Sequence, residues 1–271
     1  SFNGMDKSPS REGVDPSIQA GLDLDRAAAR SVDDLKRRHV EDISTLFERV
    51  HLELGAPGPH ADLPTDQRIA RYHEGEDPTL PALYYNFSRY LMIAGSRPGS
   101  EPLNLQGIWN EEMIPPWNCG YTTNINAEMN YWDVLRGNLA ECHEPFLRMI
   151  RETHENGKRV ASELFGYRGW CMFHNLSIWR SAAPVDGIAR TSWWPVGAGW
   201  FCQHLWHQFL MNRDRTFLEA SFPVLRDAAL FFCDWVIDRG DGKLVTPVST
   251  SPENVFVYTD AEGVRQEASV C

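Results

Sequence analysis

The sequence predicts an all-α protein with little β-structure. Apolar residues recur at helical spacing in several separate stretches, such as Leu80 to Met92 and Arg215 to Ile237, as expected for amphipathic helices. Loops rich in Gly, Pro and Trp join these stretches, and only Lys243–Val248 is typical of a short strand. Helices joined in this way indicate an array or a toroid of helical hairpins, not an alternating βαβ sheet. A toroid gathers its inter-helix loops at one end, where a site can be built.

Local signals place the helices in order. Ser31–Asp34 has the composition of a capping box, and after it apolar residues such as Leu35 and Phe47 share one helical face. Gly55–Pro59 then breaks the chain, and the aperiodic segment Asn104–Thr123 is a long loop of the kind that is often functional. Further helices are expected at Glu128–Gly137, Glu144–Phe165, Trp194–Met211 and Arg215–Ile237.

The composition is that of a soluble globular protein, with 42% hydrophobic and 23% charged residues. The net charge of -11 repels phosphate backbones and anionic lipids, so nucleic acid is not an expected partner. No stretch approaches the roughly 20 apolar residues that span a bilayer, so no membrane insertion is expected. Ser1–Gly13 is polar and is no signal peptide; the compartment stays open, and a signal peptide upstream would make the protein secreted or periplasmic.

Neither a metal site nor an organic cofactor is expected. The six cysteines show no CxxC spacing and no histidine at zinc-ligand spacing, so buried free thiols are favoured over a zinc site or disulfides. The chain also lacks GxGxxG, the P-loop, HExxH and GxSxG. The nine histidines are scattered, and those in helical segments are interpreted as structural.

The first segment that indicates chemistry is Tyr121–Trp132, which follows Asn104–Asn110 and Pro115–Trp117. It gathers the side-chain amides of three asparagines close to several aromatic rings: Asn124, Asn126, Asn130, Trp109, Trp117, Tyr131 and Trp132. Amides offer donors and acceptors without charge, and aromatic faces stack on the apolar side of a sugar ring. The pattern favours a carbohydrate site, and the alternative is that the asparagines cap the next helix.

The second segment is the turn Thr250–Asn254, in which Pro252 constrains the neighbouring carboxyl of Glu253. Apolar neighbours such as Phe256 and Trp194 would favour the protonated form of this carboxyl, which suits a general acid. The alternative is an exposed glutamate on a turn.

Several motifs, taken in order, closely resemble glycoside hydrolase family 95. They are NLQGIWN, PPW, YTTNINAEMNYW, NLAECHEP, WWPVGAGWFCQHLW and STSPEN, and the resemblance runs from Ser1 to Cys271. Members are α-L-fucosidases, and some act on α-L-galactosides. The resemblance implies a helical linker at residues 1–54 and the N-terminal half of an (α/α)6 toroid at residues 55–271. The family's β-sandwich, its remaining toroid helices and its C-terminal domain would lie outside this sequence.

The resemblance also implies an inverting mechanism. Glu253 matches the general acid, while Asn124 and Asn126 match two asparagines that hold the attacking water. An Asp that supports this water would lie beyond Cys271, so the 271-residue chain by itself is expected to be incomplete and inactive.

Other positions are assigned to the substrate by the same resemblance. Thr122 matches a position near C6 of the sugar, where a Thr leaves L-galactose open beside L-fucose. Trp194 either flanks the sugar or fills the core. His174 and Asn175 match a motif, but Leu176 and Ser177 depart from it, because an acidic residue is common there. Trp109 and Trp117 are expected as stacking surfaces.

The leading hypothesis is therefore an exo-acting hydrolase that releases terminal α-L-fucose or α-L-galactose from fucosylated or L-galactosylated glycans. One alternative is an inactive carbohydrate-binding fragment or pseudo-enzyme. Another is a different helical-toroid glycosidase or a phosphorylase, whose turnover would depend on inorganic phosphate.

Overall fold

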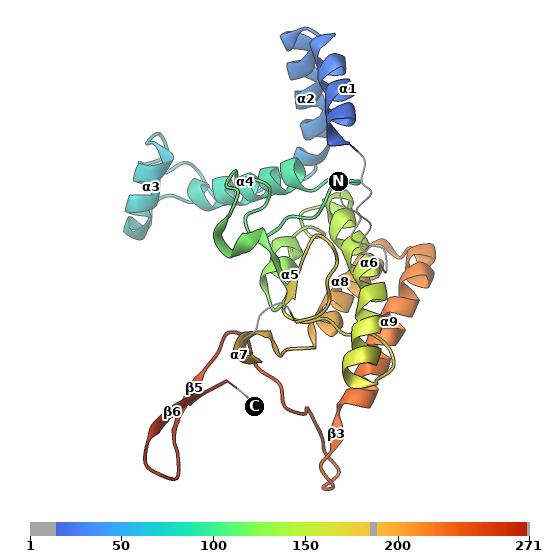
Figure 1. Ribbon diagram of the computed structural model, residues 1–271. Helices are drawn as coiled ribbons and strands as arrows, with labels where there is room; N and C mark the ends of the chain where they lie inside the picture. The colour runs from blue at the N-terminus through green and yellow to red at the C-terminus, as the bar shows by residue number, and fades with distance from the viewer. Residues whose placement is uncertain (1–14, 185–188, 270–271) are drawn as a thin grey trace. The chain divides into compact units, whose positions relative to one another are not determined.

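The computed structural model describes residues 15–184 and 189–269, and it is mostly helical (Figure 1). The chain forms two compact units. The small unit consists of residues 16–98 and 134–143, and the large unit contains the described residues of 99–133 and 144–271. The expected all-α class is confirmed, whereas closure into a toroid and the division after residue 54 stay predictions.

The small unit consists of helices and 3-10 turns. They are α1 (Pro16–Ala28), α2 (Val32–Phe47), α3 (Thr65–Arg71), η1 (Tyr72–Glu74), α4 (Thr79–Gly95) and η3 (Ala140–His143). The expected start of α2 is confirmed, because the Ser31 side chain accepts a hydrogen bond from the Asp34 amide at 3.2 Å, as an N-cap does. Helix α1 lies in the region expected as a helical linker, although no local signal singled it out, and it has no buried residue.

Buried Arg89 joins α4 to the end of α2. Its guanidinium donates to the carbonyl oxygens of Leu46 at 2.9 Å and Phe47 at 2.7 Å. The last carbonyls of a helix have no partner within the helix. Arg89 therefore satisfies two of these acceptors in α2 while its own charge lies away from water.

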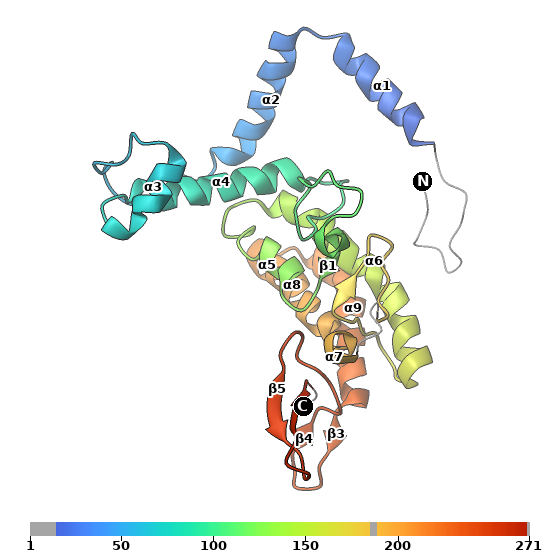
Figure 2. The same cartoon turned by 60° about the vertical axis from the view of Figure 1, so that its left-hand side comes forward.

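The large unit is built around three long helices. Its helical elements are η2 (Pro116–Cys119), α5 (Asn126–Tyr131), α6 (Glu144–Val160), η4 (Ala161–Phe165), α7 (Ala189–Ser192), α8 (Gly197–Asn212) and α9 (Arg215–Trp235). Helices α6, α8 and α9 lie side by side (Figure 2). Phe146 of α6 lies in the core, stacked on Tyr131 at 4.7 Å and edge-on to Phe201 at 4.9 Å between ring centroids.

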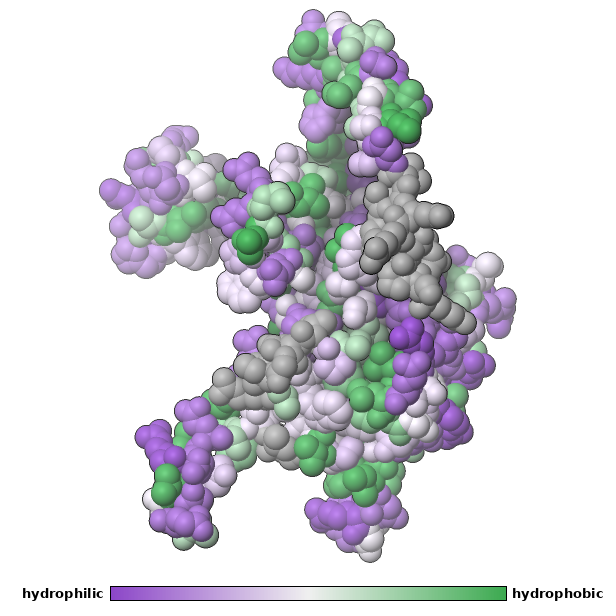
Figure 3. All heavy atoms as spheres, viewed as in Figure 1, coloured by the Kyte–Doolittle hydropathy of each residue, from purple (hydrophilic) through white to green (hydrophobic). Residues whose placement is uncertain are grey.

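Three short antiparallel pairs make up the strands of the described residues. Strand β1 (Tyr121–Thr122) pairs with β2 (Asn175–Leu176), β3 (Ile237–Asp238) with β4 (Leu244–Val245), and β5 (Phe256–Thr259) with β6 (Arg265–Ala268). The strand expected at Lys243–Val248 is confirmed over β4. The β5–β6 hairpin was not expected; all four residues of β5 are exposed, and apolar residues lie among polar ones on its surface (Figure 3).

Two expected helices differ in length from the observed ones. The helix expected at Glu128–Gly137 ends at Tyr131 and continues as turns. The helix expected from Trp194 begins at Gly197, because Pro195 follows directly and disfavours helical backbone in the residue before it.

Two further findings bear on the composition. In residues 15–184 and 189–269, no helix is both long and apolar enough to cross a membrane. Cys119, Cys142, Cys171, Cys202 and Cys233 are free thiols, while Cys271 lies outside the described residues.

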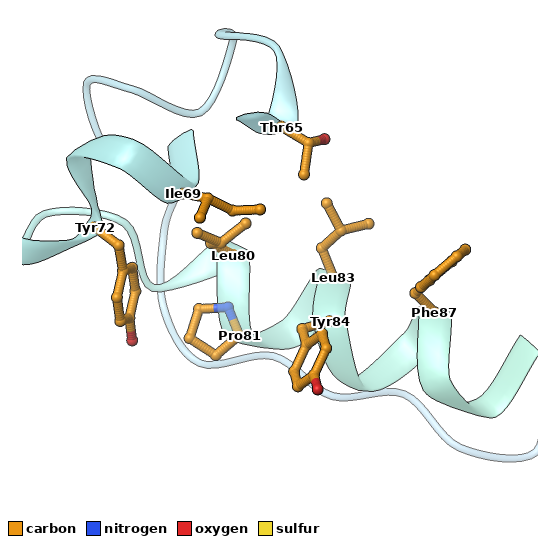
Figure 4. A pocket seen from close by; sticks show the side chains of 8 residues that line it. All are labelled: Thr65, Ile69, Tyr72, Leu80, Pro81, Leu83, Tyr84 and Phe87. Atoms are coloured by element: carbon orange, nitrogen blue, oxygen red, sulfur yellow. The ribbon is translucent and has the colours of Figure 1, made fainter. Parts of the chain in front are cut away.

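The small unit carries an apolar pocket of about 800 Å³ between α3 and α4 (Figure 4). Its lining includes Ile69, Leu83, Tyr84 and Phe87, and Tyr84 is 74% exposed and Phe87 53% exposed. Exposed apolar patches favour association. We therefore expect the 271-residue polypeptide by itself to self-associate, and the double change of Tyr84→Ser and Phe87→Ser to increase its monomer fraction in light scattering after size-exclusion chromatography. A monodisperse wild-type monomer with a sharp melting transition would contradict this.

Candidate active site

The strand pair β1–β2 positions the asparagine-rich segment. Thr122 pairs with Asn175 in the register, and Thr123, which is completely buried, is bonded to the two residues just before β2. Its amide donates to the His174 carbonyl at 2.7 Å, and its hydroxyl donates to the Phe173 carbonyl at 2.8 Å. Successive strand residues point to opposite faces, so Thr123 anchors the segment and Thr122 lies on the other face.

A chain of side-chain hydrogen bonds crosses this pair. The Thr122 hydroxyl donates to Oδ1 of Asn175 at 3.2 Å, and Nδ2 of Asn175 lies 2.9 Å from Nε2 of His174. His174 is buried, with 4% of its surface exposed. The structure thus joins Thr122 and His174 through Asn175.

The WWPVG segment forms the next part of the site. Met172 and Val196 form a parallel bridge, and the Gly197 amide donates to the Met172 carbonyl at 3.1 Å. The Trp193 carbonyl accepts from both the amide and the hydroxyl of Thr250, at 3.0 and 3.1 Å. The segment therefore connects the backbone just before His174 with the turn that carries Glu253.

Asn124 links the asparagine-rich segment to the turn that carries Glu253. Its Nδ2 donates to the carbonyl of Pro252 at 2.9 Å, and Pro252 directly precedes Glu253. Its Oδ1 is buried and has no hydrogen-bond partner among the described residues. Segments 121–126, 172–175, 193–197 and 248–254 are thereby hydrogen-bonded into one ring.

The expected acid occupies an open position. Glu253 is exposed in the turn, which is closed by a hydrogen bond from the Asn254 amide to the Ser251 carbonyl at 2.7 Å. Phe256, expected to shield the carboxyl, is itself 48% exposed, because it belongs to the exposed strand β5.

Other expected site residues surround the ring or lie apart from it. Asn126 begins α5 and is partly buried. Trp194 is partly buried and packs against Trp200 with ring centroids 6.4 Å apart. Trp109 is 53% exposed and Trp117 79% exposed; within the described residues, no hydrogen bond or ring contact joins either indole to the ring of motifs.

Glu128 was not expected as a functional candidate, although it lies in the same motif as Asn124 and Asn126. Its side chain is completely buried in α5, and neither carboxylate oxygen has a hydrogen-bond partner among the described residues. Burial raises its pKa from the ordinary value of 4.5 to about 9. A glutamate in a helix is usually exposed, and the available signal was its position three residues before buried Tyr131, on the same helical face.

Metal-binding side chains do not cluster in the part of the chain that the structure describes, since no group of three or more His, Cys, Asp or Glu residues could hold an ion there. The candidate site residues carry amide, hydroxyl, imidazole and carboxyl groups.

The structure therefore defines a mostly helical domain with a polar site assembled from loops and short strands. Residues 31–271 match the Glycosyl hydrolase family 95 catalytic domain, and the chain belongs to this family. The resemblance recognised in the sequence is confirmed.

Relatives with curated descriptions agree with the family. The chain is 35% identical over 260 residues to "Alpha-L-fucosidase 2" of Arabidopsis thaliana. The aligned region covers 94% of this chain and 31% of the relative. It is 33% identical over 259 residues to "Probable alpha-fucosidase A" of Aspergillus niger. That aligned region covers 93% of this chain and 32% of the relative. The chain thus spans about a third of the length of these relatives.

Proposed function

We propose that the protein is an inverting exo-glycoside hydrolase that releases terminal α-L-fucose or α-L-galactose from fucosylated or L-galactosylated glycans. The observation that most directly supports this proposal is the 2.9 Å hydrogen bond from the Asn124 side chain to the Pro252 carbonyl. It joins the asparagine motif that the resemblance assigns to the attacking water with the turn that it assigns to the acid. The names of the plant and fungal relatives support the same substrate class.

In the proposed reaction, Glu253 gives its proton to the glycosidic oxygen while water attacks the anomeric carbon from the opposite face. Asn124 uses Nδ2 for Pro252, so its unsatisfied Oδ1 can accept a hydrogen bond from that water. Asn126 is the second proposed water ligand. A neutral amide is too weak a base to take the proton, and the family resemblance assigns this task to an Asp beyond Cys271.

The sugar itself is proposed to lie against Thr122, His174 and Trp194, with Trp109 and Trp117 as stacking surfaces. A site that merely tolerates an extra hydroxyl discriminates weakly, by ~10²-fold, so Thr122 is proposed to accept both L-fucose and L-galactose. The division into a linker at residues 1–54 and half of a toroid at residues 55–271 belongs to the same proposal.

The test uses the longest natural polypeptide that contains this sequence. Proton NMR would follow release of sugar from α-linked L-fucosides and L-galactosides from the first minute, and we expect the β-anomer to appear first. Initial appearance of the α-anomer would refute inversion. No release of either sugar from folded protein, combined with binding of L-fucose in calorimetry, would favour the binding-protein alternative.

A further inference from the structure

We propose that Asn175 is a positioning residue that sets the direction of hydrogen bonding at Thr122 and His174. In this arrangement Thr122 offers only acceptor lone pairs to a ligand, and His174 is held as the neutral tautomer with its proton on Nδ1. The role in catalysis rests on the proposed function, whereas the hydrogen-bond directions do not.

The two ends of the Asn175 side-chain amide are chemically different. A side-chain amide has one acceptor oxygen and two N–H donors. In the proposed orientation of the amide, Oδ1 of Asn175 faces the Thr122 hydroxyl at 3.2 Å, and this hydroxyl donates its only proton to it. Nδ2 of Asn175 lies 2.9 Å from Nε2 of His174, so this ring nitrogen must accept. A neutral imidazole that accepts at Nε2 carries its proton at Nδ1. The opposite orientation would turn the N–H groups toward Thr122 and place the His174 proton on Nε2, and the tautomer measurement below separates the two.

The backbone holds this arrangement in place. Thr122 and Asn175 are register partners in the β1–β2 pair, and Thr123 bonds to the backbone of Phe173 and His174. Arg180, which is 2% exposed, anchors the chain after β2 through Glu101 at 2.8 Å and Glu152 at 2.7 Å. The three side chains thus lie on a support that is bonded on both sides of Asn175.

The consequence concerns what Thr122 can recognise. A hydroxyl whose proton is already donated can only accept from a further partner. A sugar hydroxyl that reaches Thr122 must therefore be the donor, and a methyl group at that point gains no hydrogen bond. Asn175 thereby acts on substrate selection through Thr122 without touching the substrate.

The first test reads the tautomer of His174 directly. The longest natural polypeptide, labelled with 15N-histidine, would be studied by NMR at slightly alkaline pH, with the His174 signals assigned from their loss in His174→Gln. We expect Nδ1–H in the wild type. Asn175→Asp replaces the donor by an acceptor of the same shape, so we expect the His174 proton to move to Nε2, where it can bond to the carboxylate.

Two further variants complete the design. Asn175→Leu removes both hydrogen bonds, and we expect a mixture of tautomers and a decrease of roughly 10-fold in kcat/KM, the size of one or two neutral hydrogen bonds. Asn212→Asp adds the same charge at the exposed end of α8, and its His174 tautomer should match the wild type. Nε2–H in the wild type, or an unchanged tautomer in Asn175→Asp, would overturn the proposal. If the wild type shows the expected tautomer but releases neither sugar, the proposed function is refuted and the hydrogen-bond directions are not. The NMR measurement needs no turnover.

Discussion

Glu253→Gln in the longest natural polypeptide is expected to lower kcat about 10²–10⁴-fold on natural α-L-fucosides, the usual contribution of a general acid. Glutamine keeps the shape of the side chain but has no proton to give to the glycosidic oxygen. A substrate with an activated aryl leaving group needs little protonation, so its turnover should decrease much less. The measurement is the ratio of initial rates on the two substrate types, before and after the substitution.

A nearby glutamate provides the matched control. Glu262 is exposed at the tip of the β5–β6 hairpin, and Glu262→Gln makes the same chemical change outside the ring of motifs. We expect it to keep wild-type rates on both substrates. Full activity of Glu253→Gln on a poor leaving group would show that Glu253 is not the acid.

Local sequence signals predicted much of the helical structure because they depend on neighbouring residues. The cap at Ser31 and the apolar periodicity of α4 and α9 are properties of single segments. The contact between Asn124 and Pro252 joins residues 128 positions apart, and no local pattern indicates such a pairing. The resemblance to a family named both motifs, and the structure gives the hydrogen bond that joins them.

Glu128 and the β5–β6 hairpin are features that local sequence patterns did not predict, for different physical reasons. Whether a carboxyl in a helix is exposed or buried depends on which helices pack around it, and the helical period is the same in both cases. Strand β5 is a run of apolar residues followed by Thr259, and all four of its residues are exposed, so its sequence has no alternation of polar and apolar positions that would predict a hairpin. Asn175 was recognised as part of a motif, but its function as a link between Thr122 and His174 requires the register of β1 and β2.

The buried carboxyl of Glu128 is expected to make stability decrease as pH rises. Its pKa is about 9 in the folded state against an ordinary value of 4.5, and the cause is desolvation. Between these two values the unfolded chain has lost the proton and the folded chain keeps it. The free energy of unfolding therefore decreases by about 1.4 kcal/mol per pH unit in this window and is unaffected by Glu128 below it.

Glu128→Gln removes this titration while keeping a neutral side chain of the same shape. Relative to wild type, the variant should gain stability with rising pH, by roughly 3 kcal/mol between pH ~5.5 and ~7.5 on the slope of one proton. The measurement is denaturant-induced unfolding at three pH values across the window. The free energy is taken from the transition in which the large unit unfolds. Glu219→Gln changes an exposed glutamate of α9 and should remain within about 0.5 kcal/mol of wild type at each pH. A difference between Glu128→Gln and wild type that stays constant with pH would mean that Glu128 ionises in the folded protein. In that case a cationic or hydrogen-bonding partner from outside the described residues must reach its carboxylate, since none within them does.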